Sequence, residues 1–344
     1  MGKLDELIKK MNSKAKEEVV AYGLPEYQKD RIPFTSPRMN YCTFGGLPIG
    51  RLIEFYGEEH GGKTTTALDI VANYQQMDGA KKVLYVDVEN RLDVLWATKL
   101  NVDLSANKFI CFRPSGQSAE DIMQFIQDAV ESDEVGLWII DSIPAMSSQQ
   151  ELDKDMTEKT YAGVSGPLTV FSRKIEAIMH KHHCTGIGIN QQREDMNAKY
   201  AGAMRTPGGK GWKYLCSVRM EFRKGKYIDE NGVEMNNSAE SPSGNFVLMS
   251  MTKNSTCPPT RRTGFYTINY EYGIDYLRDL VELAVKLNII VQSGSWYNIV
   301  NVDTGEIVAK AQGMSKVYSY LEDEEHEEVL SMIEDTINKL TTIE

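Results

Sequence analysis

Cysteine is scarce in this 344-residue chain, and its spacing excludes two common kinds of covalent stabilisation. The five cysteines are scattered, no two form a C-x-x-C pair, and their number is odd. A disulfide framework or a structural zinc site would require paired spacings. The pattern therefore predicts reduced thiols in a cytosolic compartment.

Long apolar runs are also missing. No stretch approaches the roughly 20 consecutive apolar residues that a membrane-spanning helix needs. The N-terminal sequence MGKLDELIKKMNSKAKEE is charged and lacks the apolar core of a secretory signal. We therefore expect a cytoplasmic protein with no membrane partner, built as one large core with one or two small modules.

The acidic net charge of -11 is unevenly distributed. Residues 321–344 carry -8 of it, which leaves only -3 for residues 1–320. Residues 193–226, by contrast, contain nine basic and three acidic residues, a net charge of +6. Such a stretch fits either a binding site for a polyanion or a solvated charged face, and charge alone favours the solvated face.

A phosphate-binding pattern organises the chain. The stretch LIEFYGEEHGGKTTTAL at 52–68 contains G-x-x-x-x-G-K-[ST], with an apolar strand before the glycines and a helix after them. Glycines let backbone N–H groups approach phosphate oxygens, and the positive end of the helix favours the same anion. Lys63 is expected to reach the β- and γ-phosphates, and the Thr64 hydroxyl to ligate Mg²⁺. The pattern predicts a nucleoside triphosphate site.

Strands and helices alternate from residue 45 onward. Apolar strands are expected at 82–86, 109–112, 137–140 and 185–189, and helices over 119–130 and from about 166 through 180. Apolar strands that alternate with helices predict a mostly parallel sheet covered on both faces. Ligands bind such sheets beyond the carboxyl ends of the strands, where the loop 57–64, Glu89, Asp141 and Gln191 all fall.

Three of these strand-end residues are candidates for the chemistry. Asp141 is expected to hold Mg²⁺ directly or through water. Glu89 is a candidate base for the attacking water, and Gln191 a candidate sensor of the γ-phosphate. For Glu89 and Gln191 the alternative is a helix cap or a surface polar group.

The segment 191–217 is glycine-rich and basic, and it carries Tyr200, Trp212 and Tyr214. It is too polar and glycine-rich for a strand, and too long for a plain connection. We therefore expect a mobile loop. Basic side chains mixed with stacking aromatic rings suit single-stranded nucleic acid.

The two ends of the chain read as separate elements. A helix with an apolar stripe is expected over 3–21, packed either on a neighbouring subunit or back on its own core. From about residue 273 we expect a helix over 275–287, short strands at 289–291 and 296–299, and a closing helix over 323–340 that carries the acidic residues.

The order and spacing of six motifs resemble RecA-type recombinases. The motifs are YGEEHGGKTTT, YVDVEN, WIIDS, INQQRE, PGGKGWKY and MTKN, and the resemblance runs from about residue 45 to about 328. It implies an α/β fold with an N-terminal helical oligomerisation segment (1–37), a RecA-type P-loop ATPase core with a mostly parallel sheet (38–272), and a small α+β C-terminal module (273–344). The acidic composition resembles phage-encoded members, which would act in a bacterial host cytoplasm.

The resemblance implies a role for each matching position. Glu89, Lys63 and Gln191 would act in catalysis. Lys213, Tyr214 and Lys253 would lie at the subunit interface, and DNA would bind two loops at 151–166 and 193–209. The nucleotide-binding residues would be Gly57, Glu58, Glu59, His60, Gly61, Gly62, Lys63, Thr64, Thr65, Asp93, Trp96, Asp141 and Lys253, with Thr64 and Asp141 holding the metal. The DNA-binding residues would be Arg193, Lys199, Tyr200, Arg205, Gly208 and Gly209.

The implied function is a DNA-dependent ATPase that uses ATP and Mg²⁺, polymerises on single-stranded DNA and catalyses homologous pairing and strand exchange in recombination and repair. Its partners would be single-stranded DNA, homologous duplex DNA, its own copies in a helical homo-oligomer, and a single-strand-binding or mediator protein. The alternatives are a ring-shaped DNA helicase and an ATP-binding DNA-coating mediator with little hydrolysis. Two departures stand out: Ser255 replaces a second interface lysine, for which Arg261 or Arg262 is a candidate substitute, and His60-Gly61 replaces small serines.

Overall fold

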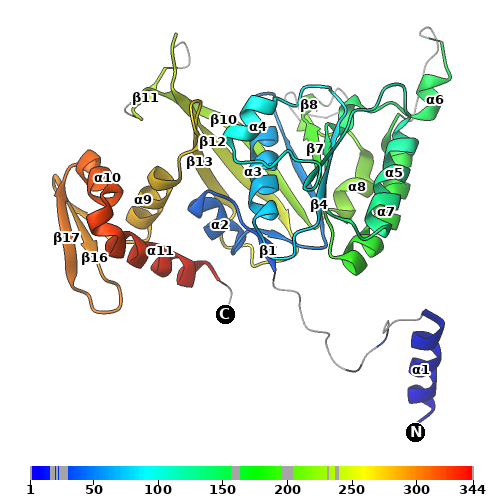
Figure 1. Cartoon of the computed structure of the whole chain (residues 1–344), viewed down its shortest axis with the longest axis horizontal. Helices are drawn as coiled ribbons and strands as arrows, with labels where there is room; N and C mark the ends of the chain where they lie inside the picture. The colour runs from blue at the N-terminus through cyan, green and yellow to red at the C-terminus, as the bar shows by residue number, and fades with distance from the viewer. Residues whose placement is uncertain are drawn as a thin grey trace. The chain divides into compact units, whose positions relative to one another are not determined.

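The computed structural model describes residues 2–15, 20, 22, 30–155, 163–194, 204–230, 232–236 and 240–342, in two units, residues 1–30 and residues 31–344 (Figure 1). The helices are α1 Lys3–Ala15, α2 Pro37–Thr43, α3 Lys63–Gln75, α4 Val94–Lys99, α5 Ala119–Glu131, α6 Gln149–Leu152, α7 Ser165–His182, α8 Gly209–Leu215, α9 Tyr276–Lys286, α10 Met314–Glu322 and α11 Glu327–Thr341. The strands are β1 Arg31–Ile32, β2 Leu47–Pro48, β3 Leu52–Gly57, β4 Lys82–Asp87, β5 Phe109–Phe112, β6 Val135–Asp141, β7 Thr185–Gln191, β8 Arg193–Glu194, β9 Met204–Arg205, β10 Val218–Ile228, β11 Glu234–Met235, β12 Gly244–Asn254, β13 Thr263–Asn269, β14 Gly273–Ile274, β15 Ile290–Ser293, β16 Trp296–Val300 and β17 Ile307–Gln312.

One large sheet forms the centre of the second unit, in the order β14-β13-β12-β10-β3-β7-β6-β4-β5, with β11 paired to β10. The strands from β10 to β5 are parallel to one another, whereas β12, β13 and β14 are antiparallel to their neighbours. Every residue of β3 is buried, as expected for a strand covered on both faces. The predicted α/β class with a mostly parallel sheet is confirmed.

Helices cover both faces of this sheet (Figure 1). Successive side chains of a strand point to opposite faces, so each strand feeds two apolar cores. Ile139 of β6 belongs to the core that includes α2, α3 and α4, while its neighbour Trp138 belongs to the core of α5, α7 and α8. The parallel strands are thereby covered on both faces, and their parallel pairing places their carboxyl ends at one edge of the sheet.

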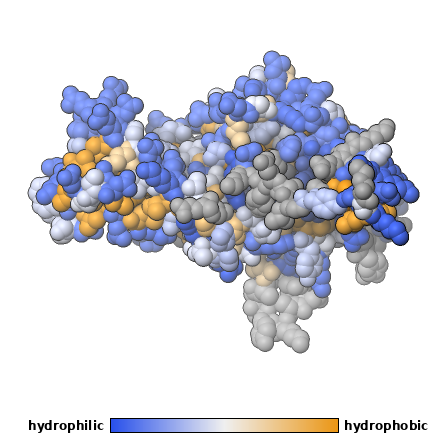
Figure 2. Space-filling model, turned by 90° about the horizontal axis from the view of Figure 1, so that it is seen from below, coloured by the Kyte–Doolittle hydropathy of each residue, from blue (hydrophilic) through white to orange (hydrophobic). Residues whose placement is uncertain are grey.

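The C-terminal residues form a smaller antiparallel sheet, β15-β16-β17, packed with α9, α10 and α11 around a third apolar core. The prediction missed β17 and α10. The predicted start of the closing helix at 323 is wrong, because Asp323 caps a short 3-10 turn and α11 begins at Glu327. In Figure 2 hydrophobic surface gathers at the left, where this module lies, and its exposed apolar residues include Trp296, Ile307 and Val308.

The first unit contains α1, none of whose residues is buried. The prediction of a helix to residue 21 is wrong at its C-terminal end, since α1 ends at Ala15 and neither Val20 nor Tyr22 is helical. The Asn12 side chain bonds to both backbone groups of Val20, at 2.8 and 2.9 Å, and so competes with continuation of the helix. Within the described ranges, no helix has the length and apolar character needed to cross a membrane.

Candidate functional site

The loop between β3 and α3 begins at Gly57 and ends at Gly62, and both glycines have positive φ angles. Gly57 has a φ of 149°, and a Cβ there would lie 2.0 Å from the carbonyl oxygen of Phe222. Gly62 has a φ of 91°, and its Cβ would lie 2.7 Å from a methyl group of Val247. Only glycine fits both positions, so the pattern's two glycines are required for this strand–loop–helix geometry.

Lys63, the first residue of α3, folds back across this loop. Its Nζ donates hydrogen bonds to the carbonyl oxygens of Gly57, at 3.2 Å, and Glu58, at 2.5 Å. The side chain is buried, and burial lowers the pKa of the Lys63 ammonium. A desolvated ammonium at the start of a helix gains most from a nearby anion, because both the charge and the helix dipole favour it.

A hydroxyl and a carboxylate meet beside the loop. Thr64 Oγ1 donates to Asp141 Oδ2 at 2.9 Å, and the Tyr85 hydroxyl donates to the same oxygen at 2.7 Å. Burial raises the pKa of Asp141, and these two hydrogen bonds oppose that rise. Oxygen donors of these two kinds suit Mg²⁺, so the pair fits the predicted metal position. Tyr85 was not predicted, because its place inside β4 reads as core.

Glu89 follows β4 and reaches the end of β6. Ser142 Oγ donates to Glu89 Oε1 at 2.5 Å, and Arg91 pairs with the other carboxylate oxygen at 3.1 Å. The backbone N–H of Val88 also donates to the carbonyl oxygen of Asp141, at 2.9 Å. The two acidic strand ends that the sequence singled out are therefore adjacent.

The loop borders a cleft of about 440 Å³ lined by His60, Gly61, Gly62, Lys63, Thr64, Thr65, Trp96, Lys224, Asn245, Ile268 and Tyr270. Trp96 donates through its indole nitrogen to Thr65 Oγ1 at 3.1 Å, which fixes the ring at the cleft wall. Asp93 caps α4 by accepting the backbone N–H of Trp96 at 3.0 Å. The last four lining residues were missed because they stand on or beside β10, β12 and β13, outside any short motif.

Gln191 ends β7 directly beside the start of the phosphate loop. It pairs in register with Gly57, and the N–H of Gln192 donates to the Gly57 carbonyl oxygen at 3.2 Å. The chain then enters residues 193–209, which we call the basic loop. Gln191, the residue expected to sense the γ-phosphate, therefore lies between the start of the phosphate loop and the start of the basic loop.

The basic loop contains regular secondary structure at its two ends, which was not predicted. The expectation that this sequence is too polar for a strand is wrong there, because Arg193 and Arg205 pair across the antiparallel ladder of β8 and β9. Gly208 and Gly209, both with positive φ, begin α8, which is anchored by the buried Trp212. Lys199 and Tyr200 lie outside the described residues.

The other predicted DNA loop, residues 151–166, begins and ends in helices. Its start belongs to α6, which runs to Leu152, and its end belongs to α7, which begins at Ser165. Ser148 caps α6 through a capping box with Glu151, which explains why a polar stretch starts a helix here. Residues 156–162 lie outside the described residues.

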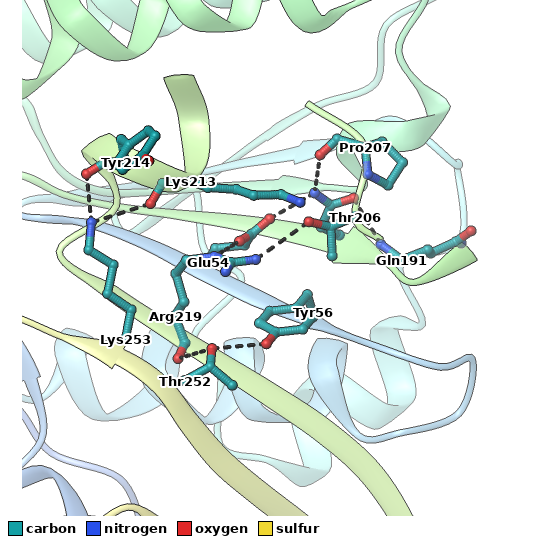
Figure 3. A network of polar contacts seen from close by, with 11 residues as sticks. Glu54, Tyr56, Gln191, Thr206, Pro207, Lys213, Tyr214, Arg219, Thr252 and Lys253 are labelled. Carbon is teal, nitrogen blue, oxygen red and sulfur yellow. Dashed lines mark hydrogen bonds and ion pairs between the residues drawn. The ribbon is translucent and has the colours of Figure 1, made fainter. Parts of the chain in front are cut away.

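The predicted interface residues lie together at the end of α8. Lys253 Nζ donates to the carbonyl oxygens of Tyr214, at 2.6 Å, and Lys213, at 3.3 Å (Figure 3). Tyr214 is 78% exposed, so its ring is available to a partner. Arg261, a candidate substitute for the lysine missing at Ser255, instead donates to the Leu340 carbonyl oxygen at the end of α11, at 2.8 Å.

Comparison with known proteins places this site in a family context. The model of the RecA N-terminal domain matches residues 6–275, and that of the RecA C-terminal domain matches residues 278–342. The protein RecA of Ruminococcus albus is 31% identical over 309 residues, 90% of this chain and 72% of its own length. The protein RecA of Aquifex aeolicus is 31% identical over 318 residues, covering 92% and 86%, and that of Nitratiruptor is 33% identical over 296 residues, covering 86% and 79%.

Proposed function

We propose, because the chain belongs to the RecA family, that it is an ATP-dependent recombinase that assembles on single-stranded DNA and exchanges strands with a homologous duplex. One observation carries the proposal: three strand ends meet at a glycine loop. Thr64 bonds to Asp141, Ser142 bonds to Glu89, and Gln191 pairs with the glycine that opens the loop. This arrangement supports hydrolysis of a nucleoside triphosphate and a response in the segment that follows β7.

In this proposal the triphosphate lies along the loop and the base lies in the cleft beside it. Lys63 stands across the loop, where its ammonium would exchange carbonyl partners for phosphate oxygens. Trp96 offers an aromatic face to the base, with its indole nitrogen already bound to Thr65. The Lys63 ammonium and the N-terminal end of α3 suit the triphosphate of ATP, and the Trp96 ring suits its base.

Thr64 and Asp141 would hold Mg²⁺, which supplies neutralising charge at the β- and γ-phosphate oxygens when bound. Glu89 would accept the proton of the attacking water. Ser142 donates a hydrogen bond to Oε1 of Glu89. The other carboxylate oxygen, Oε2, lies beside Arg91 and would take the proton. Hydrolysis by this route is slow unless the water is positioned, which makes regulation by neighbouring segments possible.

Gln191 would transmit the state of the nucleotide to the basic loop that follows it. A loop ordered by a γ-phosphate is a known kind of switch. The basic side chains would bind the DNA backbone and leave sequence recognition to base pairing between strands. Lys213, Tyr214 and Lys253 would contact the next subunit of a helical assembly.

We also propose the division into an N-terminal segment (1–37), an ATPase core (38–272) and a C-terminal module (273–344). The separate apolar core around α9, α10 and α11 supports the last boundary. Family membership favours action in the cytoplasm, with a single-strand-binding or mediator protein as a further partner.

Lys63→Ala tests the nucleotide site. The variant should lose ATP hydrolysis, with and without single-stranded DNA, by at least about a hundred-fold, because a positioned cation is removed from the phosphates. Lys81→Ala is the matched control. It removes a half-buried lysine that is paired with Asp133 just before β4 and β6 begin, at the opposite ends of these strands from the site, and it should keep full activity. Near-normal hydrolysis by Lys63→Ala would contradict the proposed site.

A further inference from the structure

A buried carboxylate stands in the strand that leads into the phosphate loop. Glu54 lies in β3, and its side chain has no exposed surface. Asn190 of β7 donates through Nδ2 to Glu54 Oε1 at 2.8 Å. Nε of Arg219, from β10 on the other side, donates to Oε2 (Figure 3). A buried charge is stable only when it is paired in this way, so Glu54 joins three adjacent strands through one polar contact set.

The same two partners hold the returning end of the basic loop. Asn190 Nδ2 also donates to the carbonyl oxygen of Pro207 at 2.9 Å, and Arg219 donates to Thr206 Oγ1 at 3.4 Å. Thr206 and Pro207 are the residues between β9 and the glycines that start α8. Asn190 Oδ1 in turn accepts the backbone N–H of Gln191 at 3.0 Å. Asn190 therefore links the Glu54 carboxylate to Gln191, which precedes the basic loop. Asn190 and Arg219 link the same carboxylate to Pro207 and Thr206, near the end of that loop.

A second branch runs from Arg219 toward Lys253 (Figure 3). The Arg219 guanidinium lies 4.6 Å from the ring centre of Tyr56, whose hydroxyl donates to Thr252 Oγ1 at 2.9 Å. Thr252 Oγ1 donates to the Arg219 carbonyl oxygen at 3.2 Å. Thr252 is followed in β12 by Lys253, which binds the Tyr214 carbonyl oxygen. The network thus extends to the end of α8.

We propose that Glu54 is a positioning residue that couples the nucleotide cleft to the basic loop, a role that rests on the function proposed above. The carboxylate takes no part in hydrolysis. It fixes the position of the Gln191 backbone and of Pro207 relative to Gly57, which ends the same strand as Glu54. This contact set acts beside the direct backbone pairing of Gln191 with Gly57. A change at the phosphate loop and a change at the basic loop each alter it, so each biases the other. Couplings between two binding sites typically change an affinity by about 5- to 150-fold.

Glu54→Gln tests this role, because it keeps the shape of the side chain and removes its charge. The measurements are ATP hydrolysis with and without single-stranded DNA, and binding of a fluorescent ATP analogue. Binding and DNA-free hydrolysis should stay within about two-fold of wild type, whereas stimulation by DNA should fall about ten-fold. Glu282→Gln is the control, since it removes the charge of another glutamate that is paired with arginines, Arg278 at 3.0 Å and Arg38 at 3.8 Å, and should keep full stimulation.

Thr206→Val is a second variant, which removes the contact to Arg219 without disturbing the buried charge. Thr206→Val should lower the stimulation of ATP hydrolysis by DNA about two- to three-fold, while the midpoint of thermal unfolding stays unchanged. If Glu54→Gln does not fold, this variant alone tests the positioning role. Full stimulation in the folded variants, or equal loss of hydrolysis with and without DNA, overturns the positioning role. A wild-type protein whose hydrolysis does not respond to DNA overturns the proposed function itself.

Discussion

Gly57 ends β3 against the backbone of β10, where there is no space for a methyl group. In Gly57→Ala, the added Cβ would lie 2.0 Å from the carbonyl oxygen of Phe222. The new alanine would also have to adopt a φ of 149°, which side chains rarely allow. The variant should lose binding of a fluorescent ATP analogue by more than about ten-fold, because the phosphate loop must shift. Titration of the analogue into the purified variant checks this.

Gly79→Ala is the matched control for that experiment. Gly79 also has a positive φ, 71°, but a Cβ there would meet nothing within 4 Å. It should therefore cost only about 1–2 kcal/mol of folding stability, from backbone strain, and leave nucleotide binding unchanged. Wild-type affinity in Gly57→Ala, or equal loss in both variants, would show that the close approach does not shape the site.

The sequence was sufficient to predict the residues of this site that stand in motifs, and insufficient for the others. Lys63, Thr64 and Asp141 were predicted because a phosphate loop and an acidic strand end have recognisable local patterns. Asn245 and Tyr270 line the same cleft, but their hydrogen bond to each other, at 2.7 Å, joins a strand and a turn 25 residues apart. No local pattern indicates such a contact, because the sheet order creates it.

At the scale of elements, α2 is joined to α9 through a buried acidic side chain. Asp279 accepts a hydrogen bond from Ser36 and lies 3.6 Å from Arg38. Burial raises its pKa from 3.8 to about 7, against the opposing effects of Ser36 and Arg38. Between these pH values the folded protein holds a proton that the unfolded chain releases. The contribution of Asp279 to folding stability is therefore full below about pH 4 and lost as the pH rises through 7.

Asp279→Asn should remove this dependence, because an amide keeps the shape and does not titrate. Urea unfolding at pH 5, 6, 7 and 8 measures it. The wild-type free energy of unfolding should fall relative to that of the variant by on the order of 1 kcal/mol per pH unit up to about pH 7, and should level off above it. Parallel curves for the two proteins would mean that Asp279 keeps an ordinary pKa. In that case the carboxylate is ionised across this range, and its contacts with Ser36 and Arg38 hold α9 on α2 with little dependence on pH.

Prediction of elements succeeded where apolar runs were continuous. The strand at 109–112 was predicted with the bounds of β5, and the helix at 119–130 matches α5 to within one residue, because Ser118 and Asp121 form a capping box. The antiparallel half of the sheet was not predicted. In β12 the buried residues Val247, Met249 and Met251 alternate with partly or fully exposed ones. This is the pattern of a half-buried strand, so this part of the sheet carried a sequence signal that the prediction left out.

At the scale of the whole molecule, the proposed function requires assembly on DNA. Electron microscopy of the protein on long single-stranded DNA should show continuous filaments with a slowly hydrolysed ATP analogue, and few or none with ADP. The reason is that, in the proposed function, the γ-phosphate orders the basic loop. Closed rings would favour the ring-shaped helicase. DNA left bare in both states would contradict the proposed partner.

The same experiment tests the N-terminal helix as the connection between subunits. Leu4, Leu7 and Met11 of α1 are 60%, 61% and 53% exposed, and an apolar stripe of this kind gains stability only when another surface covers it. Replacing all three by serine should shorten or abolish the filaments while nucleotide binding stays intact. Lys10→Ser, on the same helix, should leave the filaments unchanged. Normal filaments from the triple variant would mean that the stripe is covered within its own subunit, so that assembly depends on the surface around Tyr214 and Lys253 instead.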